Sequence, residues 1–568
     1  MAVPEIIQQK ANDIRAKVYG REVRESLASG LEVAGDIADQ ANTKSEYASD
    51  KVDNIQSQVD QLVVEGDSSV EAAQARVDAD GNAYTTLKER LDTEHTFVIA
   101  QLAEKPTIIK SDETYTVGST GDFQTINEAL DYLSEKYPKN NSTQPYQVEI
   151  KLLSGFEVRE QIFVKGIDLG WIVITSEDSE VPIIRSEMTK PTLAPPNRPQ
   201  RFPTFLAEYG TLPIIGCLFN MDDSGEATNR DGIVAHHSSK AYILRGCGVK
   251  NAGSRGIYSR RGSSIIAVGA VASGAGEYGF HARHSALMDC REGDATNCLG
   301  DGISAWDACL IDAERANVSG CNGYGVHAYR SSVINAREIT ATDCGGAGVR
   351  AEDSSTINFA EGDSSNAGGH GLYALNGSTI NAYGATANDV GMNGAFAFRG
   401  STINANGLKA LSAGGAGARA EEASMINLRN GDVTNSSGHG IYATQGSTIN
   451  ADGATADEAG INAVYAEKGS TINFENGTGM NASDTGLYAT RVSDINANGA
   501  NVSGASNRGI YSQKGSRVNI DTGNAQKGAS TSSSDMVVAN GSTINAYGAT
   551  GGKSQDFNVL TADGIIYQ

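Results

Sequence analysis

One 23-residue unit recurs through the second half of the chain and limits what it can fold into. "GSTINAYGATA" begins at Gly377, "GSTINADGATA" at Gly446 and "GSTINAYGATG" at Gly541. Measured at the isoleucine of "TIN", the apolar column is Ile265, Met288, Ile311, Ile334, Ile357, Ile380, Ile403, Ile426, Ile449, Ile472, Ile495 and Val518. A glycine column from Gly256 to Gly509 keeps the same spacing, with Ala463 as its exception. A period this strict is the signature of a repeat architecture.

Within each unit, short apolar-polar alternation ("GIYA", "TINA") is broken by Gly, Ser and Asn. This is strand periodicity with turns, not the 3.6-residue spacing of a helix. Successive units must then stack in parallel at roughly 4.8 Å per coil. The pattern predicts a mainly β protein, a right-handed parallel β-helix with about 23 residues per coil. A leucine-rich repeat, the main rival at this length, lacks its leucine pattern here.

Stacking places each residue above its counterpart 23 positions later, so columns become ladders. The predicted amide ladder is Asn335, Asn358, Asn381, Asn404, Asn427, Asn450, Asn473, Asn496 and Asn519. A parallel hydroxyl ladder is Ser332, Ser355, Ser378, Ser401, Ser424, Ser447, Ser470, Ser493 and Ser516. Cys298, Cys321 and Cys344 share a slot that later holds Ala367 and Val390, which indicates a small interior position rather than a redox site.

The first hundred residues follow a different pattern. Apolar residues, half of them alanine, fit heptad a and d positions from Ala34 to Leu62, with Ser45 the polar exception. Such a core suits a parallel homotrimeric coiled coil, and an intramolecular helical hairpin is the alternative. "NAQKGASTSSSDMVV" adds three residues before Ile544, and "DFNVLTADGIIYQ" lacks the amide ladder, so we expect it to close the β-helix.

Two N-terminal stretches carry a family resemblance. "IRAKVYGREVRESLASGLE" and "ARVDADGNAYTTLKERLD" (Ala75 to Asp92) resemble the attachment region of tail-fibre and appendage proteins of phages that infect Gram-positive bacteria. The resemblance implies a virion tail protein, made in the host cytoplasm. Its N-terminus would dock on a tail, baseplate or neck protein, and its variable module would meet the host surface.

A second resemblance begins after Pro106. "YTVGSTGDFQTINEALDYLSE" and "YQVEIKLLSGFEVREQIFV" are similar to the opening of pectin methylesterases and other pectin-lyase-like β-helices. The resemblance implies that a short helix, with Ile126, Ala129, Leu130 and Leu133 on one side, caps the first coil. The G-x-V-D-F-I-F-G stretch that carries a catalytic Asp in those esterases is missing, so esterase activity is not expected.

These features divide the chain into five segments. They are an N-terminal helical or coiled-coil attachment region (1–66), a helical connector (67–106), the capped start of the β-helix with a loop insertion (107–225), the regular 23-residue β-helix (226–522) and closing coils (523–568). The insertion is the Pro-rich stretch from Thr189 to Phe205, which is unsuited to a strand interior.

Bulk properties exclude several classes of protein. A formal net charge of -23 argues against nucleic acid as a partner. We find neither a signal peptide nor an apolar run long enough to insert in a membrane. The seven cysteines contain no C-x-x-C pair, so neither a disulfide framework nor a zinc site is predicted. We expect no cofactor, although acidic turns could gather a structural calcium ion.

Two residues after each glycine of the column, alternation should turn a side chain outward. This column is Tyr258, His281, Ser304, His327, Arg350, Tyr373, Phe396, Arg419, Tyr442, Tyr465, Tyr488 and Tyr511. Rings and guanidinium groups along one face suit stacking on sugars and binding of phosphate or carboxylate, so Tyr258, His281, His327, Arg350, Tyr373, Arg419 and Tyr442 are candidate glycan contacts. The alternative is that these side chains pack between subunits or stabilise the sheet.

The amide column has one informative break, because Asp289 and Asp312 replace Asn in consecutive coils. Stacking would place the two carboxyls about 5 Å apart, the spacing that a retaining glycosidase uses. Glu292 and Glu314 lie in the same coils and are secondary catalytic candidates. The alternative is a structural turn, paired with Arg291 or Arg315 or gathered around calcium. His236 and His237 are adjacent on a predicted strand and should point to opposite faces, so no metal site is predicted there.

Three hypotheses about function follow. The first is a tail fibre or tailspike that binds a host cell-wall polysaccharide or teichoic acid. The second is a depolymerase that cuts that glycan. The third is a purely structural tail or neck appendage. The regularity of the repeat favours binding or scaffolding over catalysis, because active sites usually break local rules.

Overall fold

The computed structural model describes residues 47–58, 74–103, 107–109, 111–138, 148–188, 203–221, 230–527, 535–555 and 564–567, together with helical residues 9, 12, 29, 34 and 44. The chain forms two compact units, Met1–Pro106 and Thr107–Gln568. Most of the heptad segment, the Pro-rich stretch 189–202 and residues 556–563 of the closing coils lie outside the described residues.

The first unit contains helix and one tight hairpin. Residues 47–58 are helical, and helix α4 spans Leu87–Ala103. Between them Val77 bridges Ala83 in antiparallel fashion, so the connector is not helical throughout. Hydrogen bonds from Asn82 to the carboxylate of Asp78 lower the pKa of Asp78 to about 2. The "VDADGNAY" motif is thus a turn organised around one aspartate.

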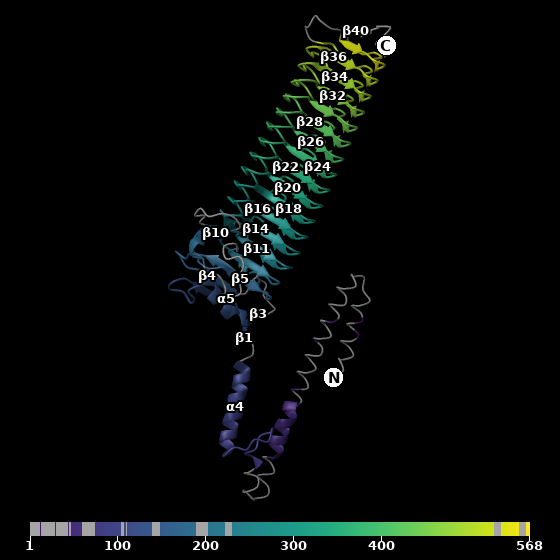
Figure 1. Ribbon diagram of the computed structural model, residues 1–568. Coiled ribbons are helices and arrows are strands. Elements are labelled where there is room, and N and C mark those ends of the chain that lie inside the picture. The colour runs from purple at the N-terminus through teal and green to yellow at the C-terminus, as the bar shows by residue number, and fades with distance from the viewer. Residues whose placement is uncertain are drawn as a thin grey trace. The chain divides into compact units, whose positions relative to one another are not determined.

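The second unit is a parallel β-solenoid in which successive coils stack along one axis (Figure 1). Its long sheet has the strand order β5-β8-β11-β14-β16-β18-β20-β22-β24-β26-β28-β30-β32-β34-β36-β38-β40. Neighbouring strands pair in parallel, as β5 does with β8 and β11 with β14. The long-sheet strands are β5 (Ile162–Lys165), β8 (Phe205–Glu208), β11 (Ile233–His236), β14 (Arg255–Arg260), β16 (Tyr278–Arg283), β18 (Asp301–Trp306), β20 (Val326–Tyr329), β22 (Val349–Glu352), β24 (Leu372–Leu375), β26 (Ala395–Phe398), β28 (Ala418–Glu421), β30 (Ile441–Ala443), β32 (Val464–Glu467), β34 (Thr485–Thr490), β36 (Arg508–Ser512), β38 (Met536–Val538) and β40 (Lys553–Gln555).

A second, 15-stranded parallel sheet carries the "TIN" triplets. Its strands are β12 (Lys240–Tyr242), β15 (Ser264–Ile266), β17 (Leu287–Asp289), β19 (Leu310–Asp312), β21 (Val333–Asn335), β23 (Thr356–Asn358), β25 (Thr379–Asn381), β27 (Thr402–Asn404), β29 (Met425–Asn427), β31 (Thr448–Asn450), β33 (Thr471–Asn473), β35 (Asp494–Asn496), β37 (Arg517–Asn519), β39 (Thr543–Asn545) and β41 (Ile565–Tyr567). Single parallel bridges from Gly248–Val271 to Asn524–Thr550 form the third side of each coil. The predicted parallel β-solenoid with 23-residue coils is confirmed.

Shorter sheets build the first coils. One pairs β1 (Thr107–Ile109) with β3 (Lys136–Pro138). A second has the strand order β2 (Glu113–Val117), β4 (Val148–Leu152), β6 (Ile172–Ser176) and β9 (Ile214–Ile215), and a third has the order β7 (Val181–Ile183), β10 (Leu218–Met221) and β13 (Gly248–Lys250). A 3-10 helix covers Arg185–Glu187. Phe205, which the sequence placed in the loop insertion, is instead a fully buried residue of β8.

The predicted cap is present as helix α5, Ile126–Ser134. Ile126, Ala129, Leu130 and Leu133 are its buried residues, and Thr125 begins it with a capping box. The helix therefore covers apolar surface at the first coil, which would otherwise be open.

Both polar ladders form, and they work differently. Amides of the asparagine column bond along the axis, as in Asn358 to Asn335 at 3.0 Å and Asn404 to Asn381 at 2.8 Å. In the serine column each buried hydroxyl accepts the backbone N–H of the preceding serine, as when Ser378 N donates to Ser401 Oγ at 3.2 Å. The serine ladder therefore satisfies backbone donors at a corner where strand pairing has ended.

The interior is filled by the apolar columns. The "TIN" isoleucines are at most 2% exposed, and Met288 is 3% exposed. Cys298, Cys321 and Cys344 are free thiols buried in the same core, as expected for small interior fillers. Among the described residues no helix is long and apolar enough to cross a bilayer.

Candidate functional site

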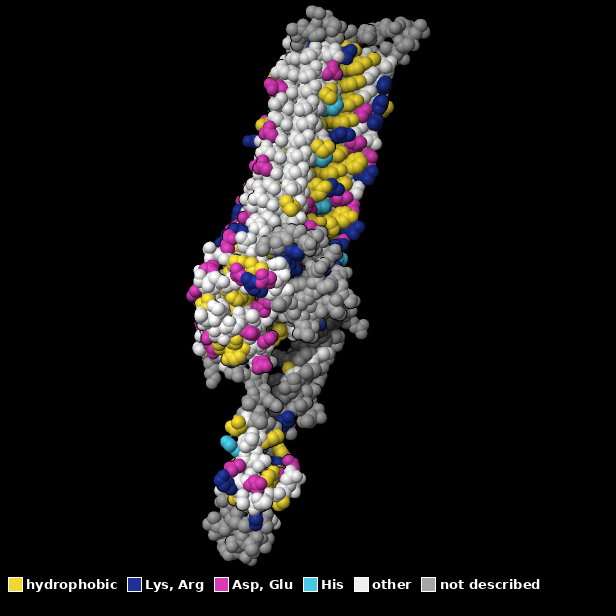
Figure 2. Space-filling view, turned by 60° about the vertical axis from the view of Figure 1, so that its left-hand side comes forward, with side chains coloured by type: hydrophobic (Ala, Val, Ile, Leu, Met, Phe, Trp, Pro, Cys, Tyr) yellow, Lys and Arg dark blue, Asp and Glu magenta, His cyan; other side chains and the backbone are white. Residues whose placement is uncertain are grey.

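The outer surface of the long sheet from β14 to β36 gathers most of the rings and guanidinium groups of the solenoid, and we call it the aromatic face. Figure 2 shows hydrophobic, histidine and basic side chains running along this side of the solenoid, beside a largely uncoloured neighbouring face. Its middle column is the predicted one, from Tyr258 to Tyr511. In each strand the residues before and after the column member point into the interior, as Leu372 and Ala374 do on either side of Tyr373, so the column member points outward. All seven candidate glycan contacts therefore share one face.

The predicted exposure of this column is wrong for its first members. Tyr258, His281 and His327 are only 3%, 1% and 8% exposed, whereas Arg350 and Tyr373 are half-buried. Alternation settles which side of the sheet a residue occupies, but large neighbours on the same side can still cover it. Here Tyr278 and Trp306 pack against His281, with ring centroids 4.6 and 5.6 Å from it.

The rings of the middle column stack on one another along the axis. Tyr373 and Phe396 lie 5.3 Å apart with an interplanar angle of 2°, and Tyr442 and Tyr465 lie 5.1 Å apart at 13°. Their faces are therefore occupied by neighbouring coils, which leaves ring edges for solvent. Sugars therefore cannot stack on the faces of these rings, as the sequence suggested, because neighbouring rings already cover those faces.

A buried acid–histidine cluster interrupts the stack. His327 Nδ1 lies 3.1 Å from Asp301 Oδ2, and its Nε2 lies 3.9 Å from Glu352 Oε2. Burial alone would lower the pKa of His327, but the two carboxylates outweigh it and raise that pKa. His327 and then Arg350 lower the pKa of Glu352 to about 2, against the effect of burial. The cluster holds a protonatable group between two carboxylates at the surface of the sheet.

Several polar atoms beside this cluster have no hydrogen-bond partner among the described residues. They lie on three consecutive strands and are His281 Nδ1, Ser304 Oγ, Trp306 Nε1 and His327 Nε2. His281 is neutral near pH 7, because burial first, and then Arg255 and Arg283, lower its pKa well below the usual value. Each of these atoms is buried, so a ligand would reach them only after the surrounding rings move.

Asp289 and Asp312 lie on the second sheet, away from the histidines of the same coils. They face each other across β17 and β19, as stacking predicts. One guanidinium binds both, because Arg291 contacts Asp289 at 2.9 and 2.7 Å and lies 3.6 Å from Asp312. Asn335 also donates to Asp312 at 2.9 Å. This is the structural pairing that the sequence left open, and it leaves the carboxylates engaged rather than poised for acid–base chemistry.

The secondary candidates are engaged in the same way. Glu292 pairs with Arg245 at 2.7 Å and with Arg315 at 3.2 Å, and Arg245 is the main cause of the lowered pKa of Glu292. Glu314 lies 3.4 Å from Arg315. The four carboxylates belong to two groups of ion pairs, one on β17 and β19 and one in the turns that follow them.

The argument that His236 and His237 point to opposite faces is wrong. The backbone leaves β11 at His237, where φ is 56°, and the two rings stack with centroids 3.7 Å apart. Together with Glu208, the two histidines bring three possible metal ligands within 4.8 Å of one another, and no other such group occurs among the described residues. Arg261 Nη1 lies 2.7 Å from His237 Nε2, and this positive surrounding disfavours a cation.

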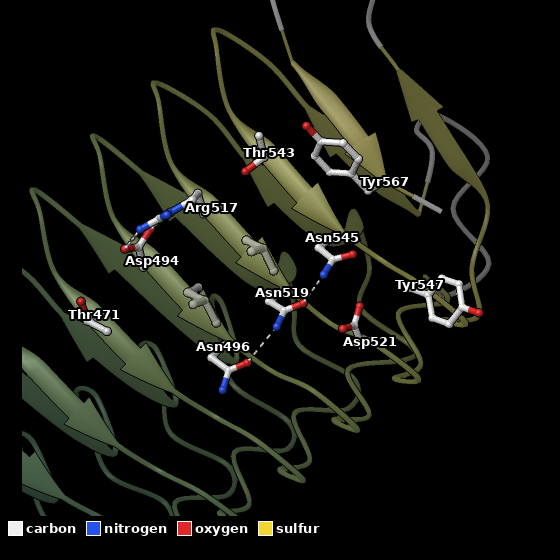
Figure 3. A pocket seen from close by; sticks show the side chains of 12 residues that line it. Thr471, Asp494, Asn496, Arg517, Asn519, Asp521, Thr543, Asn545, Tyr547 and Tyr567 are labelled. Carbon is white, nitrogen blue, oxygen red and sulfur yellow. Dashed lines mark hydrogen bonds and ion pairs between the residues drawn. The ribbon is translucent and has the colours of Figure 1, made fainter.

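A groove of about 840 Å³ lies on the second sheet near the C-terminal end (Figure 3). Asn496, Asn519 and Asn545 line it, and their amides bond to one another at 3.3 and 2.9 Å. Arg517 and Asp494 beside them form an ion pair at 2.8 Å. Because these polar groups satisfy each other, the groove is a weaker candidate than the aromatic face.

Sequence reasoning missed the two columns that flank the middle column. Asp301, Tyr324 and His370 precede it by three residues, whereas Trp306 and Glu352 follow it by two. The signal was available in the same 23-residue lattice, since both columns are rich in rings and carboxylates. Asp301, His327 and Glu352 come from all three columns, so only the coil geometry brings them together.

A comparison with protein families supports the fold. Residues 231–387 match a family model described as a right handed beta helix region. No curated protein matches the chain. Among solved structures, the chain is similar to the periplasmic alginate epimerase AlgG, with 10% identity, TM-score 0.29, and coverage of 80% of this chain and 88% of that one. It is also similar to the catalytic unit of a GH87 alpha-1,3-glucanase from Streptomyces thermodiastaticus, with 12% identity, TM-score 0.22 and coverage of 57% and 64%.

Proposed function

We propose that the protein is a tail fibre or tailspike of a phage that infects Gram-positive bacteria, and that its aromatic face binds a glycan of the host surface. The N-terminal motifs support the virion role, and docking through that end would leave the solenoid free to meet the cell. The observation that carries the binding role is the half-buried column of rings and guanidinium groups from Arg350 to Tyr511, which runs along one face of the solenoid.

Carbohydrate recognition needs this combination of groups. Sugar hydroxyls both donate and accept hydrogen bonds, which matches the half-buried tyrosine hydroxyls, guanidinium groups and carboxylates of this face. Ring edges and the guanidinium groups of Arg350 and Arg419 supply further contacts beside them. A homotrimer would present three such faces or bury them between subunits, so accessibility of the face in the full-length protein is part of the test.

The experiment uses fluorescent full-length protein and a panel of Gram-positive cells, before and after removal of wall polysaccharide and teichoic acid. We expect labelling of at least one strain that is lost when the glycan is removed. Tyr442→Ala should weaken labelling, and Tyr383→Ala, a matched change at an exposed tyrosine off the face, should not. Tyr442→Phe, which keeps the ring stack, separates lost contact from lost folding. Absence of labelling in every strain would leave the structural appendage as the better description.

A second function, depolymerisation of the same glycan, is favoured by the Asp301–His327–Glu352 cluster. Both ring nitrogens of His327 face carboxylates, so catalysis would require Glu352 to move away from Nε2; a protonated His327 would then donate to a leaving oxygen while Glu352 activates water. The assay measures new reducing ends released from the bound glycan by wild-type protein, Glu352→Gln and the double variant Asp289→Asn/Asp312→Asn. Loss of product with Glu352→Gln alone supports catalysis at the cluster. Unchanged polymer with retained binding rejects the enzyme.

A further inference from the structure

The aromatic face repeats with a longer period than the coil. "GHGLYALNGSTINAYGATA" begins at Gly369, and "GHGIYATQGSTINADGATA" begins at Gly438, 69 residues or three coils later. The β-helix itself requires only a 23-residue period, and adjacent coils differ on this face. His327, Arg350 and Tyr373, for example, occupy the same column in consecutive coils.

Several side chains of the aromatic face are kept between the two copies, together with the ladder residues of the solenoid. The identical pairs on this face are Arg350 and Arg419, Glu352 and Glu421, His370 and His439, Tyr373 and Tyr442, and Asn393 and Asn462. Positions elsewhere differ, including Ala360 and Arg429, Glu361 and Asn430, and Tyr383 and Asp452. The solenoid requires its ladder residues in every coil, as in Asn381 and Asn450, but it does not require the same side chains on the aromatic face, so their retention there indicates a shared task.

The arrangement around each arginine is similar, although one of its two rings comes from a different column in each copy. Arg350 lies over Tyr324 and Tyr373, with its guanidinium carbon 5.0 and 5.3 Å from the ring centroids. Arg419 lies over Phe396 and Tyr442 at 5.2 Å from each ring. Each copy therefore holds a guanidinium between two rings.

Charge is balanced in both copies. Arg350 Nη2 contacts Glu352 at 2.6 Å, and Arg419 Nη2 contacts Glu421 at 2.5 Å. These side chains are 18% to 34% exposed, so the paired groups still reach the surface. A neutral donor–acceptor pair suits sugar hydroxyls, whereas a phosphate or uronate would meet the repelling carboxylate.

We infer that the aromatic face carries two equivalent subsites, centred on Arg350 and Arg419, and that together they bind one neutral linear polysaccharide running parallel to the solenoid axis. This inference rests on the proposed glycan binding and specifies its ligand. Three coils separate the subsites by roughly 14 Å, at about 4.8 Å per coil. The polymer must then present the same group at that spacing or a simple fraction of it. A chain that reaches both subsites gains avidity, on the order of 10² or more.

The test measures the affinity of full-length protein for fragments of increasing length. The probe is neutral wall polysaccharide from the strain that the labelled protein binds, freed of phosphate and separated by size. Poly(glycerol phosphate) of matched length is the anionic probe. We expect a step of at least about 10-fold in affinity when fragments exceed roughly 14 Å. We expect little salt dependence and weaker binding of the anionic polymer.

Single-residue variants test which side chains cause the increase in affinity with fragment length. Arg350→Ala and Arg419→Ala should each abolish the step and keep binding of short fragments, and the double variant should lose both. Arg429→Ala, at an exposed arginine off the face, should match wild type. Glu352→Gln and Glu421→Gln serve as second variants if either arginine change impairs folding. Affinity that rises smoothly with length, or preference for the anionic polymer, would overturn the inference while glycan binding stands. Failure of every fragment to bind would instead contradict the proposed function.

Discussion

The methyl group of Ala463 occupies space that Gly479 leaves open. A Cβ atom at position 479 would lie 2.6 Å from Cβ of Ala463, which is too close for a real contact. In other coils the same pair of positions, 16 residues apart, has the reverse arrangement. Gly256 faces Ala272 and Gly302 faces Val318, with Cβ separations of 2.8 and 2.5 Å if the glycine had a side chain. The single exception in the glycine column is therefore compensated inside the solenoid.

This relationship predicts that a substitution at position 479 destabilises the protein and that a second substitution at position 463 compensates for it. Gly479→Ala should lower the free energy of unfolding by about 1–3 kcal/mol, because it overpacks the interior. Adding Ala463→Gly should restore most of the loss, since it recreates the arrangement of the other coils. Denaturant unfolding of both single variants and the double variant measures the coupling. Additive effects would show that the two positions do not share the space.

The serine ladder predicts a loss of stability when one hydroxyl is removed. Ser401→Ala leaves the buried N–H of Ser378 without its acceptor, which should cost about 1–3 kcal/mol. Ser401→Cys should cost less, because Cys309 fills the equivalent slot and accepts from Ala286 N at 3.2 Å. Thermal unfolding compares the two variants, and an equal loss in both would contradict the ladder's role as acceptor.

Histidines of the aromatic face predict a pH dependence. Burial and nearby arginines lower the pKa of His370 and His439 from 6.5 to about 4. Between those values the unfolded chain binds protons that the folded chain does not, so stability should fall as pH is lowered from 6.5 to 4. His370→Asn should flatten this dependence while keeping an acceptor for the N–H of Asn393. The measurement is the free energy of unfolding at several pH values, and an unchanged slope would contradict the lowered pKa.

His327 should behave in the opposite sense. Its pKa is raised in the folded state, so its contribution is fully present below the unfolded pKa and is lost as pH rises through the folded value. His327→Asn should therefore destabilise more at pH 6 than at pH 8. A larger loss at pH 8 would mean that burial outweighs Asp301 and Glu352.

The N-terminal heptads predict a trimer. Val52 and Ile55, on predicted core positions, are 64% and 47% exposed in the single chain. Sedimentation equilibrium of the full-length protein should give three times 59.3 kDa. Val52→Asp/Ile55→Asp should shift the species toward monomer, and a monomeric wild type would contradict the coiled coil.

Periodicity alone was enough to predict the solenoid and its ladders, because each coil repeats the same local chemistry, whereas the cap residues of α5 followed from the resemblance to pectin-lyase-like β-helices. It also placed Tyr258, His281 and Arg350 in one column. It could not predict burial of Tyr258 and His281, since that depends on rings from the flanking columns. His237 was misplaced because its positive φ has no marker in the sequence. The Asp301–His327–Glu352 cluster was missed because it joins three columns and three coils.

The central claim is that the aromatic face binds a surface polysaccharide, and a crystal structure of the full-length protein with a wall-polysaccharide fragment tests it most directly. The account predicts sugar density along the axis beside Arg350, Tyr373, Arg419 and Tyr442, with the same contacts three coils apart. Density on the asparagine ladder of the second sheet, with the aromatic face buried between subunits, would contradict it.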